Sequence, residues 1–162
     1  MGGSWCCYWL LVVVLTSKGH TILMVLKREQ QDQLVAAARV VRENAYAPAS
    51  KFLVGAAVLT DAGDIFVGCN VENASYGLTI CAERSAICAA VAAGARHVVA
   101  VAVVTDLVKP ARPCGACRQV LAEFGPEMTV LLAGSGSEVS ATTLAKLLPE
   151  PFTFAGGDLP SD

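Results

Sequence analysis

Two cysteines, Cys114 and Cys117, lie three positions apart directly after Pro113. A proline at this place favours the start of a helix, and the first turn of a helix points both thiols to the same side. The positive end of the helix dipole also stabilises a thiolate there. One such pair taken alone is ambiguous, because it fits a metal site, a redox-active dithiol or coincidence.

A third thiol comes from Cys81, two positions before Glu83, at the start of another predicted helix. A structural zinc site normally needs a second C-x-x-C or a pair of histidines. The sequence has no second C-x-x-C, and its two histidines do not form a pair, because His20 lies in the apolar head and His97 begins a predicted strand. Three thiolates leave one tetrahedral position open for water, which is typical of a catalytic zinc site. The pattern predicts Cys81, Cys114 and Cys117 as ligands, whereas the alternative is that they are small buried residues.

These side chains need a scaffold, and the hydrophobic pattern predicts one. Leu34, Ala38, Val41 and Ala45 recur at helical spacing before Pro48. Further helices are expected at 79–93, 114–124 and 142–148, and strands at 52–59, 65–69, 97–105, 128–133 and from 139 onward. The order αββαβαββα predicts an α/β fold of three layers, a mixed five-stranded sheet with helices on both faces.

The sequence supports more specific expectations for one helix and two cysteines. The segment 79–93 is apolar on nearly all sides, which predicts a buried helix that ends at Gly94. Cys69 and Cys88 have no ligand partner nearby in the sequence, so we expect both in the core.

A chain of 162 residues is the size of one domain. We expect that domain at 27–155, preceded by an apolar head over 1–26 and followed by a tail over 156–162. The hypothesis for the head is that translation begins at Met24; the alternatives are a membrane or partner anchor and a signal segment. The uncharged run from Trp5 to Leu15 is too short to span a bilayer, which needs about 20 residues, so no membrane association is expected.

The overall charge disfavours nucleic acid as a partner, since the net charge is −2 and the isoelectric point about 5.7. The mean hydropathy of +0.54 and the 54% hydrophobic residues exclude a disordered chain. Seven cysteines at irregular spacing indicate reduced thiols and therefore a cytoplasmic protein.

The segments Cys81-Ala82-Glu83-Arg84 and 113–119 (PCGACRQ) together resemble the zinc-dependent cytidine deaminases of the small, homotetrameric type with a three-cysteine zinc site. The segments 54–57 (VGAA) and 68–77 (GCNVENASYG) match the same family in order and spacing. The resemblance extends from about Lys27 to Phe152 and leaves the head outside it.

The resemblance implies the hydrolytic deamination of cytidine and 2′-deoxycytidine to uridine and 2′-deoxyuridine, a step of pyrimidine salvage, with one Zn²⁺ per subunit. A zinc-bound hydroxide would attack C4 of cytosine, and Glu83 would shuttle the protons to N3 and to the departing ammonia. Arg84 would hydrogen-bond the ligating cysteines and offset the negative charge of three thiolates.

The resemblance also implies a substrate pocket. Asn70 and Glu72 match the pair that holds the ribose hydroxyls, Phe52 matches the ring that stacks on the pyrimidine, and the backbone N–H of Ala82 would meet a base oxygen. Such a pocket would take a free nucleoside.

Two aromatic residues, Tyr76 and Phe152, match positions that contribute to a neighbouring subunit's site in tetrameric members of the family. A homotetramer is therefore expected.

Three other functions stay open on the sequence. A deaminase of a cytosine nucleoside analogue or antibiotic would share the zinc motifs, although Asn70 and Glu72 favour a ribose. An inactive zinc-binding structural module would have no need of Glu83. An editing deaminase acting on RNA or DNA is disfavoured by the net charge.

Overall fold

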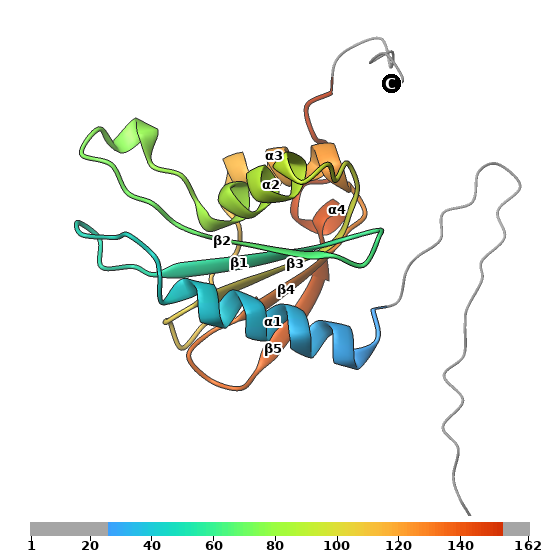
Figure 1. The fold of residues 1–162 in the computed structure, drawn as a ribbon, viewed down its shortest axis with the longest axis horizontal. Coiled ribbons are helices and arrows are strands. Elements are labelled where there is room, and N and C mark those ends of the chain that lie inside the picture. Colours follow the sequence, from blue (N-terminus) through green and yellow to red (C-terminus); the bar gives the residue numbers. More distant parts are fainter. Residues whose placement is uncertain (1–25, 154–162) are drawn as a thin grey trace, which may run out of the picture.

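The computed structural model describes residues 26–153 of the chain, and in this part a single sheet lies between two layers of helices (Figure 1). The strands follow the order β2-β1-β3-β4-β5 across the sheet. Their bounds are β1 (Val54–Thr60), β2 (Ile65–Cys69), β3 (Val98–Thr105), β4 (Thr129–Ala133) and β5 (Val139–Thr143).

The sheet is mixed, as the sequence predicts. The hairpin of β1 and β2 is antiparallel, and β1 also runs antiparallel to β3. The pair β3 and β4 is parallel, and β5 returns antiparallel to β4. The predicted α/β class, with a five-stranded sheet, is confirmed.

One face of the sheet is covered by the first helix, α1 (Arg28–Arg42), which crosses in front of the strands in Figure 1. Leu34 and Ala38 of α1 are fully buried in a core with Ala57 of β1 and Ala102 of β3. This layer has no part in the thiol cluster, so its contribution is to seal one side of the sheet.

The other face is covered by α2 (Ala82–Ala92), α3 (Gly115–Phe124) and α4 (Leu144–Leu147). Gly68 of β2 allows α2 to approach closely, because a Cβ at this position would lie 2.3 Å from the backbone nitrogen of Ala86. The contact fixes α2 against the sheet and so places the first turn of α2, which carries Glu83.

The predicted helix at 79–93 begins later, at Ala82, because Ile80 is held in extended backbone. Its N–H donates to the carbonyl oxygen of Val71 at 3.0 Å, and its own carbonyl oxygen accepts from the Val71 N–H at 2.9 Å. A short 3₁₀ turn, η1 (Tyr76–Leu78), precedes this bridge and was not expected.

The first helix ends at Arg42, before the predicted limit near Pro48. Tyr46 forms an isolated bridge with Val71, and its N–H donates to the Asn70 carbonyl oxygen at 3.0 Å. This pairing draws the chain out of helical conformation several residues before the proline.

The expectation that α2 is buried on nearly all sides is wrong, since Cys88 and Ala89 are exposed. The placement of Cys88 in the core is wrong for the same reason. Cys69 is only partly buried, because β2 is an edge strand, and its thiol lies 3.5 Å from the carbonyl oxygen of Asn44. High alanine content made α2 apolar all round without requiring burial of every side.

The predicted head at 1–26 falls outside the described residues except for Leu26, and the tail at 156–162 lies wholly outside them. Leu26 is 7% exposed and packs in the α1 core, so the packed domain includes at least this one residue before the predicted boundary. Within residues 26–153, no helix combines the length and the apolar character that crossing a membrane requires.

Candidate active site

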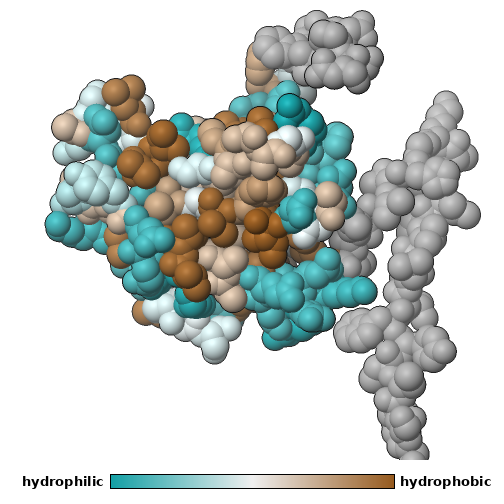
Figure 2. All heavy atoms as spheres, viewed as in Figure 1, coloured by the Kyte–Doolittle hydropathy of each residue, from teal (hydrophilic) through white to brown (hydrophobic). Residues whose placement is uncertain are grey.

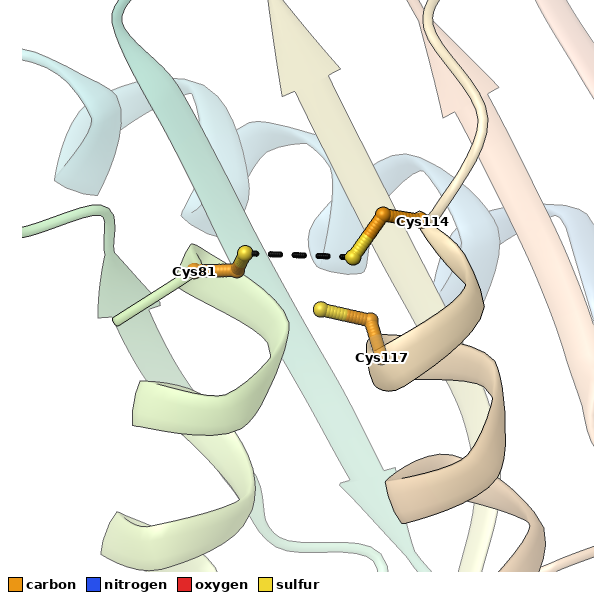
Figure 3. A group of neighbouring side chains, drawn as sticks. All are labelled: Cys81, Cys114 and Cys117. Atoms are coloured by element: carbon orange, nitrogen blue, oxygen red, sulfur yellow. Dashed lines mark hydrogen bonds between the residues drawn. The ribbon is translucent and has the colours of Figure 1, made fainter. Parts of the chain in front are cut away.

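Three thiols meet where the N-termini of α2 and α3 converge (Figure 3). Cys81 occupies the N-cap position of α2, Cys114 occupies the N-cap position of α3, and Cys117 lies in the first turn of α3. The sulfur atoms all lie within 4.8 Å of one another, and the Sγ atoms of Cys81 and Cys114 are 4.0 Å apart. The structure thus brings together the three cysteines that the sequence predicts as ligands of one site.

The cluster has the dimensions of a zinc site. Tetrahedral zinc with Zn–S bonds of about 2.3 Å separates two of its sulfur ligands by roughly 3.8 Å. The observed Sγ–Sγ separation of 4.0 Å is close to this value, and no disulfide links the three cysteines. Three soft ligands from rigid helix ends also match the preference of zinc for thiolates.

The electrostatics of the cluster favour a thiolate at Cys81. Its pKa is lowered to about 5, first by a hydrogen bond from the Cys117 thiol and further by the guanidinium of Arg84. The pKa of Cys117 is raised, since it serves as the hydrogen-bond donor to Cys81 and is buried. The Arg84 Nη2 atom lies 3.7 Å from the Sγ of Cys81 and donates to the carbonyl oxygen of Thr79 at 2.9 Å.

Glu83 is placed in the first turn of α2 with only 4% of its surface exposed. Burial raises the pKa of this carboxyl, and the negative charge of Cys81 raises it further. A buried carboxyl with a raised pKa beside a cluster of three thiols is suited to accept and release a proton.

A cavity of about 250 Å³ opens onto the cluster. Its walls come from the first turn of α2, from β1 and β3, and from the segments before β1, between β2 and α2, and before α3. The lining residues are Ser50, Phe52, Val54, Asn70, Glu72, Thr79, Cys81, Ala82, Glu83, Val103, Thr105, Ala111, Arg112 and Cys114. Five predicted substrate or catalytic residues are therefore brought to one cavity: Phe52, Asn70, Glu72, Ala82 and Glu83.

The side chain of Asn70 holds the backbone on both sides of Leu53. Its Nδ2 donates to the carbonyl oxygen of Phe52 at 2.9 Å, and its Oδ1 accepts from the N–H of Val54 at 2.8 Å. Asn70 is 8% exposed. The structure thus gives Asn70 a positioning task for Phe52, while its contact with ribose stays a prediction.

Glu72 organises the loop before β1 in a similar way. Its carboxylate accepts from the N–H of Ala49 at 2.8 Å and from the N–H of Ser50 at 3.3 Å. Hydrogen bonds from the Ser50 side chain and the Ala49 backbone lower the pKa of Glu72, so the side chain stays anionic at neutral pH. Its contact with a ribose hydroxyl also stays a prediction.

The two remaining predicted residues do not line the cavity of this chain. Tyr76 lies in η1 and is 79% exposed, and Phe152 is 71% exposed. The backbone of Phe152 exchanges two hydrogen bonds with the side chain of Gln119, at 2.8 and 2.9 Å. Neither aromatic residue therefore contributes to the cavity that its own chain forms.

Sequence reasoning missed several residues of the cavity wall. Ser50, Thr105, Ala111 and Arg112 lie in it without belonging to any motif that could be singled out. Thr105 carries the one available signal, a hydroxyl at the end of an otherwise apolar strand. The others are brought to the cavity by loops.

The fold and the site define a class of protein, an α/β enzyme with a candidate catalytic zinc site, and comparison with known proteins shows that it is a deaminase. Residues 28–133 match the family model described as the cytidine and deoxycytidylate deaminase zinc-binding region. Together with the thiol cluster, this match confirms the prediction of one zinc ion per chain.

The chain is similar to cytidine deaminases over most of its length. It is 50% identical over 123 residues to that of Sporosarcina psychrophila, covering 75% of this chain and 90% of the relative. The crystal structure of the cytidine deaminase from Burkholderia pseudomallei superposes with a TM-score of 0.73 at 48% identity, covering 78% of this chain and all of the other. For the cytidine deaminase of Mycobacterium tuberculosis the values are 0.66 and 41%, with coverage of 76% and 97%. The protein belongs to the cytidine deaminase family.

Proposed function

We propose that this protein deaminates cytidine and 2′-deoxycytidine to uridine and 2′-deoxyuridine, with release of ammonia. The observation that carries the proposal is the buried Glu83 in the same cavity as the thiol cluster. The overall reaction adds water: a C–O bond forms at C4, and the bond between C4 and the amino nitrogen breaks.

Cys81, Cys114 and Cys117 are proposed to hold the zinc ion, which polarises a water molecule for attack on C4 when bound. Glu83 would accept the proton that this water loses and deliver it to N3 of the ring. A second transfer through the same carboxyl would carry the proton of the new C4 hydroxyl to the amino group, which departs as ammonia and leaves a carbonyl at C4. The raised pKa of Glu83 supports both transfers, because it brings the acid and base forms closer in free energy at neutral pH.

Arg84 is proposed to tune the charge of the site. Three thiolates bring more negative charge than Zn²⁺ neutralises, and the guanidinium beside Cys81 offsets part of it. The N-termini of α2 and α3 add partial positive charge at the same place.

The substrate is proposed to lie with its base on Phe52 and its ribose toward Asn70 and Glu72. The N–H of Ala82 supports this orientation, because the first residue of a helix has no acceptor for its N–H within the helix. It would donate to the carbonyl oxygen at C2 of the pyrimidine.

A homotetramer is proposed as the working assembly, with Tyr76 and Phe152 reaching a neighbouring subunit's cavity. Their exposure supports this, and so does a second hollow of about 420 Å³ beside α1, lined largely by apolar residues that include Val40 and Val67. Figure 2 shows apolar side chains gathered in the middle of one face. Exposed apolar surface of this kind is typical of an interface.

We also propose a cytoplasmic location, because the three proposed ligands must stay reduced to bind zinc. The domain limits of 27–155 remain a proposal as well, apart from the inclusion of Leu26.

Turnover of cytidine, followed by the loss of its absorbance, tests the proposal. We expect the zinc-loaded protein to convert cytidine and Glu83→Gln to retain zinc while losing at least about a hundredfold in kcat. A zinc-loaded wild type that leaves cytidine and 2′-deoxycytidine unchanged would contradict the proposal and point to a structural zinc module. Turnover restricted to a base-modified nucleoside would point to an analogue deaminase.

A further inference from the structure

Two residues of the motif 113–119 (PCGACRQ) have no part in the proposed mechanism, Arg118 and Gln119. They are consecutive residues of α3 and directly follow the proposed ligand Cys117. Both side chains donate hydrogen bonds to the backbone of the segment 147–152, to residues that lie 29 and 33 positions further along the chain. The structure therefore gives both side chains a task at the C-terminal end of the described chain.

The Gln119 side chain holds Phe152 by both polar groups of its backbone. Its Oε1 accepts from the Phe152 N–H at 2.9 Å, and its Nε2 donates to the Phe152 carbonyl oxygen at 2.8 Å. A primary amide carries a donor and an acceptor side by side, so it can pair with the N–H and the C=O of one residue as a neighbouring strand does. Two such bonds fix both the place and the orientation of the Phe152 backbone relative to α3.

Arg118 holds the other end of the same segment. Its Nη1 donates to the carbonyl oxygen of Leu147 at 2.8 Å, and its Nε donates to that of Pro113 at 2.8 Å. Two of the four residues between the anchors at Leu147 and Phe152 are prolines, whose φ angles are fixed. A short segment that is held at both ends and contains two prolines has few conformations open to it.

The residue that this arrangement holds is not buried in its own chain. Phe152 is 71% exposed and does not line the cavity. Ordering a chain segment costs conformational entropy, and burial of an aromatic side chain is a common compensation for that cost. Here polar contacts order the backbone while most of the aromatic residue stays at the surface. Such an arrangement suits a side chain that acts on another molecule.

We propose that Gln119 is a positioning residue for the reaction, which fixes the backbone of Phe152 so that the aromatic ring is presented to the cavity of a neighbouring subunit. The inference rests on the proposed function, which assigns Phe152 to that cavity. Helix α3 then serves two cavities, since Cys117 belongs to its own thiol cluster and Gln119 sets an aromatic residue of the next site. Loss of this preorganisation should weaken nucleoside binding more than it slows the chemical step.

The test compares Gln119→Leu, which removes both hydrogen bonds and keeps the approximate size of the side chain, with Glu123→Leu. The second variant introduces the same residue one turn later on α3, at an exposed position. We expect Gln119→Leu to raise KM for cytidine roughly three- to tenfold, with kcat within about twofold of wild type and zinc content unchanged. Glu123→Leu should keep KM and kcat within about twofold of wild type.

A double-mutant cycle with Phe152→Ala separates positioning from a general structural role. This replacement removes the ring and leaves the backbone N–H and carbonyl oxygen that Gln119 holds. Because Gln119 is proposed to act through the ring, Gln119→Leu should raise KM in the wild-type background and leave it unchanged in the Phe152→Ala background. A general loss of structure would raise KM by the same factor in both backgrounds.

Three outcomes would overturn the inference: an unchanged KM in Gln119→Leu, the same factor in both backgrounds, or an unchanged KM in Phe152→Ala. The Kd for uridine, measured by calorimetry in the same cycle, requires no turnover. If the wild type bound uridine but failed to deaminate cytidine, the proposed function would fall, and the cycle in Kd would still decide whether Gln119 acts through Phe152. A wild type that binds no uridine would overturn both.

Discussion

The carbonyl oxygen of Phe52 accepts a hydrogen bond of 2.9 Å from the side-chain amide of Asn70. The residue proposed to stack on the substrate base is thus held by a residue proposed to bind its ribose. This hydrogen bond connects the proposed base-binding and ribose-binding parts of the cavity within the protein itself.

Replacement of Asn70 should therefore affect stability as well as binding. In Asn70→Ala the carbonyl oxygen of Phe52 and the N–H of Val54 both lose their partner in a largely buried place. We expect a loss of about 1–3 kcal/mol in the free energy of unfolding, measured by urea denaturation, together with a rise in KM. A rise in KM at unchanged stability would show that Asn70 acts on the ribose alone.

The lowered pKa of Glu72 predicts a pH-dependent contribution to stability. A carboxyl whose pKa is lower in the folded than in the unfolded chain stabilises the fold above its ordinary pKa of 4.5, and the contribution is lost as pH falls through the lowered value. The Tm of wild type should exceed that of Glu72→Gln near neutral pH, and the gap should close in acid. A gap that is independent of pH would contradict the assignment.

Loss of zinc should follow from removal of any one of the clustered thiols. We expect Cys117→Ser, which changes a fully buried member of the cluster, to lose bound zinc and cytidine turnover together. Metal content by atomic emission and an activity assay measure both. Cys88→Ser is the matched control, because this cysteine is exposed and outside the cluster, and it should keep zinc and activity.

Arg84 should affect the zinc site without being a ligand. Replacement by Gln removes the positive charge beside Cys81 and the hydrogen bond to the carbonyl oxygen of Thr79. We expect zinc affinity or kcat to fall by roughly 10- to 100-fold, with the fold retained by circular dichroism. Unchanged zinc affinity and kcat would show that Arg84 only holds the loop at Thr79 through its hydrogen bond to the Thr79 carbonyl oxygen.

The proposed trans contribution of the aromatic residues predicts a dependence on assembly. Light scattering on the purified protein should give the mass of four chains. Tyr76→Ala should then raise KM without loss of zinc, since the ring is 79% exposed in the single chain and lies outside its cavity. A fully active monomer would contradict both the tetramer and the role of Tyr76.

The sequence by itself determined the order of the elements and the proposed ligands, because hydrophobic period, glycine and proline signals, and cysteine spacing are local properties. The prediction that the helix at 79–93 is buried on nearly all sides failed at Cys88, since apolar composition does not distinguish a core-facing side from an exposed one.

Tertiary structure decided which residues meet. Thr105 and Arg112 enter the cavity only because the ends of β1 and β3 and the loop before α3 converge there. Likewise, the sequence resemblance matched Asn70 to a residue that holds the ribose. Its hydrogen bonds to the backbone of Phe52 and Val54 depend on chain segments that only folding brings together. Such contacts leave no local period or spacing in the sequence, because they are fixed by packing between distant segments.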